Sequence, residues 1–169
     1  MAKITSRQIA VMGIGAALFG VLATITAPIG IGTWGAQLRP AVAIPISIGI
    51  LFGPLPGFVV GAIGNVICDA VALGRVSICG PVGSGLMGLV AGLMGFRKKE
   101  NMLYVILAGL IGGFACGPGA AYVAVLEMGA PWEVANMLAL TIGIPDAILG
   151  AILAPPIVKA YLAQVPATS

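Results

Sequence analysis

The stretch that decides the fold runs from residue 40 to residue 68, PAVAIPISIGILFGPLPGFVVGAIGNVIC, and contains no ionisable side chain. A membrane-spanning helix needs about 20 apolar residues, so this stretch is too long for one span. The hexapeptide Phe52-Gly-Pro-Leu-Pro-Gly57 interrupts it, and each proline removes a helical hydrogen bond. We therefore predict two spans, at about residues 37–51 and 57–73, joined by a tight turn.

The rest of the chain is just as poor in charge. Hydrophobic residues make up 60% of it and charged residues 8%, with a mean hydropathy of +1.14, far from the averages of soluble domains. We predict an all-α, polytopic membrane protein in which residues 1–169 form a single six-transmembrane-helix bundle. The other four spans are expected at about residues 8–27, 81–96, 102–126 and 132–153. Gly117-Pro-Gly119 and Pro145 predict kinks or breaks in the last two.

The cationic residues fall at alternate ends of these spans. An N-in arrangement places six of them on the cytoplasmic side: Lys3, Arg7, Arg97, Lys98, Lys99 and Lys159. Only Arg39 and Arg75 are then left on the outside, in agreement with the positive-inside rule. We predict N-in/C-in topology in the plasma membrane. The first span is expected to be retained, because its apolar stretch exceeds the ~7–15 residues of a signal peptide.

Six of the other seven charged residues gather at the outer half of the predicted bundle: Arg39, Asp69, Arg75, Glu127, Glu133 and Asp146. Such residues usually line a cavity or pair with one another, so they predict a polar pocket open to the outside. Asn65 and Asp69 share one helix face, where an amide beside a carboxylate suits the edge of a heterocycle or an amine. The alternative is that Asp69 pairs with Arg39 or Arg75 in a purely structural role.

Aromatic and amide residues near these charges complete the candidate pocket. Trp34 lies in a glycine-rich outer loop and offers a flat face for stacking, although an interfacial tryptophan is an alternative for it and for Trp132. Asp146 has helix capping as its alternative, and Glu133 is favoured as a solvated loop charge. The candidate substrate-binding residues are Trp34, Gln37, Arg39, Asn65, Asp69, Arg75, Tyr122, Glu127, Asn136 and Asp146.

Small residues recur along the first predicted span at Gly13, Ala16, Ala17 and Gly20. The spacings Gly13/Ala17 and Ala16/Gly20 place small residues on one helix face, which lets a second helix approach closely in lipid. Spacing alone leaves open whether that helix is internal or belongs to another subunit. We name these four residues the α1 stripe and treat them as candidate partner-binding residues.

Catalysis finds little support in the sequence. The chain contains no histidine, no paired-cysteine metal spacing and no Gly-x-Ser-x-Gly elbow, and Cys68, Cys79 and Cys116 are interpreted as small buried apolar residues. It also lacks a phosphate-binding loop, so ATP-driven transport would need another polypeptide to hydrolyse ATP. We expect no enzyme activity, no cofactor, no bound metal and no nucleic-acid partner.

In layout and in three local features the chain resembles the substrate-binding S components of energy-coupling factor (ECF) transporters, in their riboflavin-type and uncharacterised branch. The features are the α1 stripe, the segment from Leu38-Arg-Pro to Leu-Pro-Gly57, and Gly61-x-x-Gly-Asn-x-x-x-Asp69. The resemblance implies a binder that docks through the stripe onto a transmembrane coupling subunit driven by two ATPases. It also implies that residues 28–36, with Trp34, act as a gate.

The chemistry of the outer residues favours a neutral or cationic heteroaromatic substrate, such as riboflavin, thiamine or a 7-deazaguanine, over a polyanion such as folate. Two other classes of function stay open at this point. One is a stand-alone small transporter or channel, although the inner halves of the spans show almost no polar residues beyond serine and threonine. The other is a structural or assembly subunit of a larger membrane complex.

Overall fold

The computed structural model describes residues 5–27 and 39–164, and these residues fold into helices without strands. The α-helices are α1 (Ser6–Thr26), α2 (Ala43–Phe52), α3 (Pro54–Cys68), α4 (Cys79–Gly95), α5 (Met102–Met128) and α6 (Trp132–Gln164). Short helical segments extend three of them: η1 (Pro40–Val42) precedes α2, η2 (Asp69–Leu73) continues α3, and η3 (Phe96–Lys98) continues α4. The predicted all-α class is confirmed.

Five helices are long and apolar enough to cross a membrane: Ser6–Thr26, Pro54–Leu73, Cys79–Lys98, Met102–Met128 and Trp132–Gln164. The segment formed by η1 and α2, Pro40–Phe52, is apolar but shorter. Large hydrophobic side chains such as Leu126 lie exposed on the outside of the bundle, as expected for a surface that faces lipid. Five of the six predicted spans are therefore confirmed in length and composition, and the sixth stays a prediction.

The turn between α2 and α3 is tighter than predicted. Gly53 alone separates the two helices and has a φ of 110°, a conformation that glycine adopts without steric cost. Pro54 is the first residue of α3, where a helix does not need the missing N–H. The prediction that α3 begins at Gly57 is thus wrong, because the prolines start the helix instead of separating two helices.

The breaks predicted at the prolines of α5 and α6 are absent from these two helices. Pro118 lies inside α5, and Pro145, Pro155 and Pro156 lie inside α6, which runs to Gln164 and not to about residue 153. Both helices are continuous. A proline removes one hydrogen bond from a helix, and neighbouring helices in a membrane bundle compensate for that loss.

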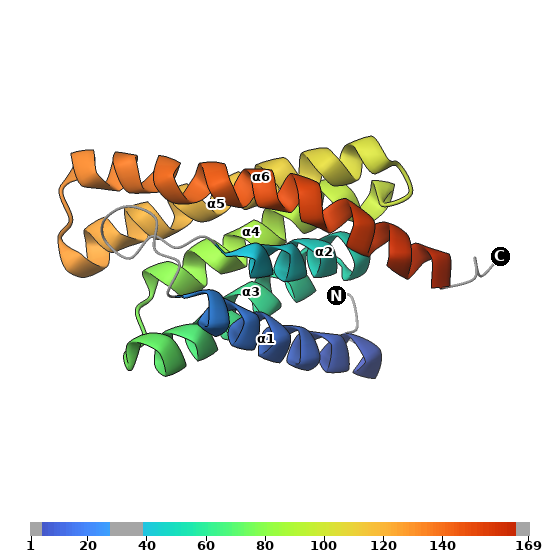
Figure 1. The fold of residues 1–169 in the computed structure, drawn as a ribbon, viewed down its shortest axis with the longest axis horizontal. Coiled ribbons are helices and arrows are strands. Elements are labelled where there is room, and N and C mark those ends of the chain that lie inside the picture. Colours follow the sequence, from blue (N-terminus) through green and yellow to red (C-terminus); the bar gives the residue numbers. More distant parts are fainter. Residues whose placement is uncertain (1–4, 28–38, 165–169) are drawn as a thin grey trace.

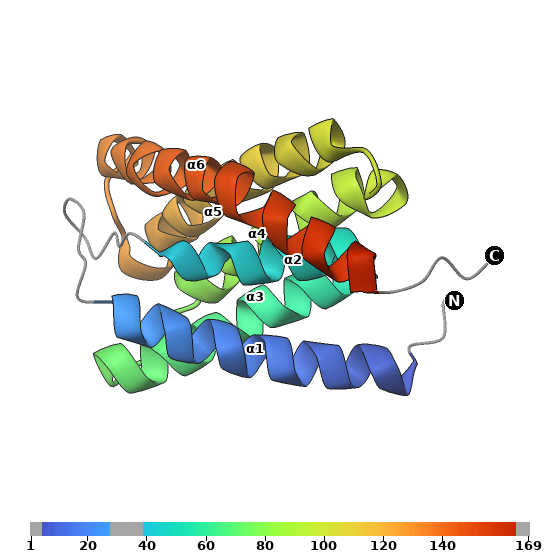
Figure 2. The ribbon, with the colours of Figure 1, turned by 45° about the vertical axis from the view of Figure 1, so that its right-hand side comes forward.

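From α3 onward the helices pack mainly against their neighbours in the chain, whereas α1 packs mainly against α3 and α2 against α4 (Figures 1 and 2). α1 lies along α3 on one side of the bundle, α5 lies along α6 on the other, and α2 and α4 lie between these pairs. The central crossing is made by glycines: a Cβ on Gly88 of α4 would overlap the backbone of Gly57 in α3, and a Cβ on Gly57 would overlap that of Gly88. At this crossing, α3 and α4 therefore approach backbone to backbone.

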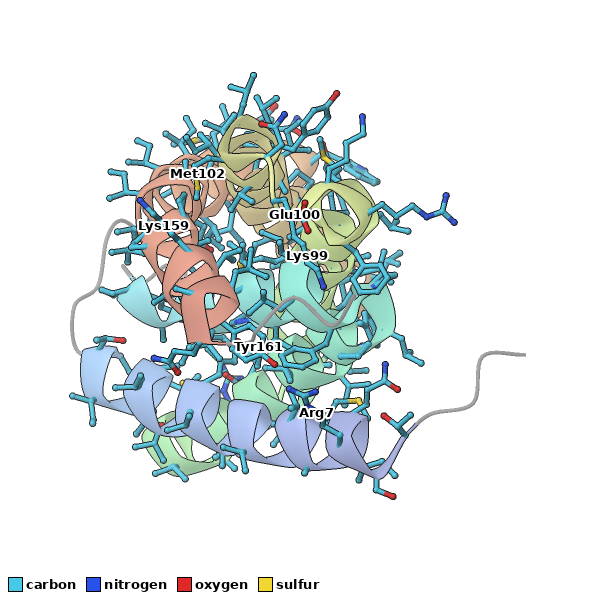
Figure 3. The ribbon with its side chains drawn as sticks, turned by 90° about the vertical axis from the view of Figure 1, so that its right-hand side faces the viewer. Arg7, Lys99, Glu100, Met102, Lys159 and Tyr161 are labelled. Atoms are coloured by element: carbon cyan, nitrogen blue, oxygen red, sulfur yellow. The ribbon has the colours of Figure 1, made fainter. Side chains whose placement is uncertain are left out.

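The N-terminal and C-terminal helices meet at the end of the bundle seen in Figure 3, where Arg7, Lys99 and Lys159 lie. Arg7 Nη2 donates a 2.7 Å hydrogen bond to Tyr161 Oη, which joins α1 to α6. The Tyr161 ring also packs edge-on against Phe52 at the end of α2, with 5.4 Å between ring centroids. This end carries Arg7, Lys99 and Lys159, three of the cationic residues on which the orientation prediction rests, and we call it the cationic end.

Candidate substrate-binding cavity

A cavity of about 360 Å³ lies among the helices, away from the cationic end. α4 defines the two ends of the bundle, because its first residues, Cys79 and Gly80, line the cavity while its last turn leads into η3 and Lys98. Most of the walls are apolar, with contributions from α1, α5, α6 and η1. The polar residues that line the cavity, thiols included, are Arg39, Asn65, Asp69, Arg75, Ser77, Cys79, Ser84, Cys116 and Asp146.

Asn65 is the centre of a hydrogen-bonded network on one wall. Its Oδ1 accepts from Arg39 Nη1 at 2.6 Å and from Ser84 Oγ at 2.9 Å, and its Nδ2 donates to Asp69 Oδ1 at 3.1 Å. Ser77 Oγ donates to the other oxygen, Asp69 Oδ2, at 3.4 Å. Asn65 is fully buried and Asp69 nearly so. We name these five residues, Arg39, Asn65, Asp69, Ser77 and Ser84, the Asn65 network.

The end of α3 explains how the network is positioned. The five residues of η2, which start at Asp69, form a π-helix, and Gly74 then reverses the chain with a φ of 66°. Single π-helical turns often occur at functional sites. This turn brings Ser77 back to Asp69 and leaves Leu73 and Arg75 on the cavity wall.

Asp146 lies on another wall of the cavity, in the interior of α6. Only 3% of the residue is exposed. Cys116 of α5 lines the same cavity, and the Arg39 guanidinium is near enough to attract the Asp146 carboxyl group electrostatically. The alternative role of Asp146 as a helix cap is wrong, because α6 begins at Trp132 and continues through Asp146 without a break.

Three predicted site residues lie elsewhere. Tyr122 and Asn136 are exposed and hydrogen-bond to each other, Tyr122 Oη donating to Asn136 Oδ1 at 3.3 Å. The Tyr122 ring packs against Trp132, with 6.2 Å between centroids. The Glu127 carboxylate accepts hydrogen bonds from the backbone N–H groups of Ile78 and Cys79, at 2.9 and 3.0 Å, respectively. None of these side chains lines the cavity, and Trp34 and Gln37 lie outside the described residues.

Glu127 is better explained as a cap of α4. Its two oxygens satisfy N–H groups at the start of that helix, where an anion also interacts favourably with the helix dipole. We expect Glu127→Gln to cost about 1 kcal/mol of stability, the usual value of a helix cap. A lowered melting temperature in detergent would show the loss. Glu133→Gln serves as the control, because Glu133 also lies in the first turn of a helix but its carboxylate accepts no hydrogen bond from the described residues. Equal melting temperatures for the two variants would contradict the capping role.

The cavity also contains residues that the sequence analysis did not single out as ligand contacts, namely Ser77, Ser84 and Cys116. Serine between glycines in a membrane helix is common, so Gly83-Ser84-Gly85 gave no distinct signal. Cys116 is buried, as predicted, yet it faces a carboxyl group as well as apolar neighbours. The three cysteines, Cys68, Cys79 and Cys116, are all free thiols.

The α1 stripe divides into two pairs. Ala16 and Gly20 are buried, and a Cβ on Gly20 would press against Ile67 and the backbone of Gly64 in α3. Gly13 and Ala17 are exposed, and a Cβ on Gly13 would have no neighbour within 4 Å. Ala16 and Gly20 therefore pack within the bundle, and only Gly13 and Ala17 remain available to a partner.

Apolar helices around a cavity with a few buried polar groups are the features of a membrane protein that binds a small molecule. A family model described as "ECF-type riboflavin transporter, S component" matches residues 3–163, and the chain belongs to this family. The resemblance drawn from the sequence is confirmed. Members of the family are membrane subunits that bind a small-molecule substrate for an ECF transporter.

A curated protein is similar in sequence to this chain over part of its length. The UPF0397 protein of Streptococcus pneumoniae (strain Hungary19A-6) is 43% identical over 101 residues, which are 60% of this chain and 53% of the relative. The chain thus matches about half the length of this curated relative.

Proposed function

We propose that the protein captures a vitamin-like heteroaromatic micronutrient, of the riboflavin, thiamine or 7-deazaguanine class, from outside the cell for ATP-driven import by an ECF transporter. The observation that supports this most is the cavity, because it combines apolar walls with buried polar groups and lies away from the cationic end. A flat ring system matches the walls, and the polar groups match its heteroatoms.

The charge distribution supports the direction of capture. If the cationic end faces the cytoplasm, the cavity lies toward the outside and both termini are cytoplasmic. We propose this N-in/C-in arrangement in the plasma membrane, with a single domain whose sixth span is formed by η1 and α2. The site residues then comprise Arg39, Asn65, Asp69, Arg75 and Asp146, together with Gln37 and with Trp34 in the gate segment, residues 28–36.

Import would require partners, since the chain contains no phosphate-binding loop. We propose a transmembrane coupling subunit and two ATPase subunits, with α1 as the docking helix. The exposed pair Gly13 and Ala17 supports this role, because small residues on a lipid-facing surface let a partner helix approach closely.

Native mass spectrometry of the detergent-purified protein tests the proposal. We expect one small molecule bound per chain, which can be released and identified as a heteroaromatic compound. A protein that carries no small molecule and whose melting temperature is unchanged by a panel of vitamins and nucleobases would contradict capture. That outcome would favour a structural subunit of a membrane complex.

A further inference from the structure

Building on the proposed function, we propose that Asp146 anchors the ligand and that the ligand is a compact nitrogen heteroaromatic with two adjacent N–H donors. A ring N–H beside an exocyclic amino group, as in the pyrimidine edge of a 7-deazaguanine, provides this pair. The inference compares which polar side chains of the cavity already have hydrogen-bond partners and which remain available to a ligand. It favours the 7-deazaguanine class over the riboflavin class.

The first step is the isolation of the Asp146 carboxyl group. Within the described residues, no backbone N–H, hydroxyl or amide group donates a hydrogen bond to it, and the Arg39 guanidinium attracts it electrostatically. The nearby Cys116 thiol is at most a weak donor. A carboxylate has about four acceptor positions, so most of those on Asp146 remain available.

The second step is the contrast with the Asn65 network. Asn65 Oδ1 already accepts two hydrogen bonds, and each oxygen of Asp69 accepts one. These groups satisfy one another without a ligand. A buried carboxyl group without such partners is costly, and buried polar groups are normally hydrogen-bonded. A hydrogen-bond donor on the ligand would therefore stabilise Asp146 more than it would stabilise the groups of the Asn65 network.

The third step is the match between a carboxylate and the edges of candidate rings. Two parallel N–H donors bind both oxygens of a carboxylate, the same geometry with which arginine binds carboxylates. An imide edge, as in riboflavin, has a carbonyl oxygen on either side of its N–H group, and each oxygen would repel the carboxylate. A ring with adjacent donors is therefore the better partner for Asp146.

The walls and the size of the cavity agree with this assignment. Leu138 and Ile142 line it on the same helix as Asp146, and Phe19 and Val42 contribute from α1 and η1. These side chains provide apolar surfaces for the faces of a ring. The volume of about 360 Å³ lies near the lower end of the range for ligand sites, roughly 300–1,000 Å³. A compact double ring suits it better than a ring system with a long side chain.

Isothermal titration calorimetry on the full chain tests the inference with a matched pair of compounds. 7-Deazaguanine and 7-deazahypoxanthine differ only in the exocyclic amino group. We expect the unaltered protein to bind the first about 100-fold more tightly, the upper effect of a hydrogen bond to a charged group. Riboflavin and thiamine are measured in parallel and are expected to bind more weakly than 7-deazaguanine.

Three variants assign the effect to one carboxyl group. Asp146→Asn keeps the shape but replaces an acceptor with a donor, and we expect it to remove the preference for the amino compound. Asp69→Asn, a matched change in the Asn65 network, is expected to weaken 7-deazaguanine binding by a smaller factor than Asp146→Asn. Glu133→Gln lies outside the cavity and is expected to bind as the unaltered protein does.

The outcomes separate this inference from the proposed function. Tight binding of riboflavin or thiamine with no effect of Asp146→Asn would overturn the inference and leave capture intact. Equal affinities for 7-deazaguanine and 7-deazahypoxanthine would also overturn it. This measurement uses the unaltered protein, so the inference can be tested even if Asp146→Asn does not fold. Failure to bind any compound, together with the absence of a co-purified molecule, would overturn both.

Discussion

ATP-driven uptake by the reconstituted transporter is expected to fall to background when Ala17 is replaced with leucine, and likewise for Gly13→Leu, while ligand affinity stays unchanged. Both residues are exposed on α1, and the bundle leaves open space beside Gly13. A leucine is therefore tolerated by the fold but holds a partner helix away from the α1 backbone. Close approach through small residues drives helix association in lipid, where the hydrophobic effect does not.

Two matched changes make this experiment specific. Ala160→Leu adds the same side chain to an exposed position of α6 and is expected to preserve uptake. Ala16→Leu affects the neighbouring buried position and is expected to impair folding, because Ala16 packs against α3. Co-purification with the coupling subunit measures assembly, and calorimetry measures ligand affinity. Equal loss of assembly and of ligand binding in Ala17→Leu would contradict a separate docking surface.

Gly88→Ala is expected to destabilise the bundle by about 3 kcal/mol, the upper end of the usual cost of overpacking. The added Cβ would overlap the backbone of Gly57, and a backbone cannot move aside as a flexible side chain can. α3 and α4 would have to separate, which would disturb the Asn65 network that joins Asn65 of α3 to Ser84 of α4. Ligand binding should therefore weaken together with stability.

Unfolding of the purified protein in mixed detergent micelles measures this effect. Gly13→Ala is the matched control, because its added Cβ meets nothing within 4 Å. We expect the control to be neutral or slightly stabilising, since alanine favours a helix over glycine by about 1 kcal/mol. A Gly88→Ala variant as stable as Gly13→Ala would show that the helices at the crossing lie farther apart than described.

Charge and hydropathy predicted the helical class and the approximate position of five long apolar helices, because a membrane span requires a continuous apolar stretch. They did not predict the exact boundaries at prolines. Pro54 starts a helix and Pro145 lies within one, and the difference depends on which backbone groups neighbouring residues satisfy. Sequence around a proline does not specify those tertiary partners.

The same limit applies to the site. The scarcity of charge directed attention to Arg39, Asp69 and Asp146, which the structure brings to one cavity. It also suggested Glu127, whose carboxylate instead caps α4. Position along the chain indicates the depth of a residue in the membrane, but the direction in which its side chain points depends on how the helix is rotated in the bundle.

The order in which the helices pack bears on how the protein is made. Because most helices lie against neighbours in the chain, we expect the bundle to build up progressively as each span leaves the ribosome and enters the membrane. The hydrogen bond between Arg7 and Tyr161 joins positions 154 residues apart. It can form only after α6 has been inserted, so this contact closes the bundle last among the described helices.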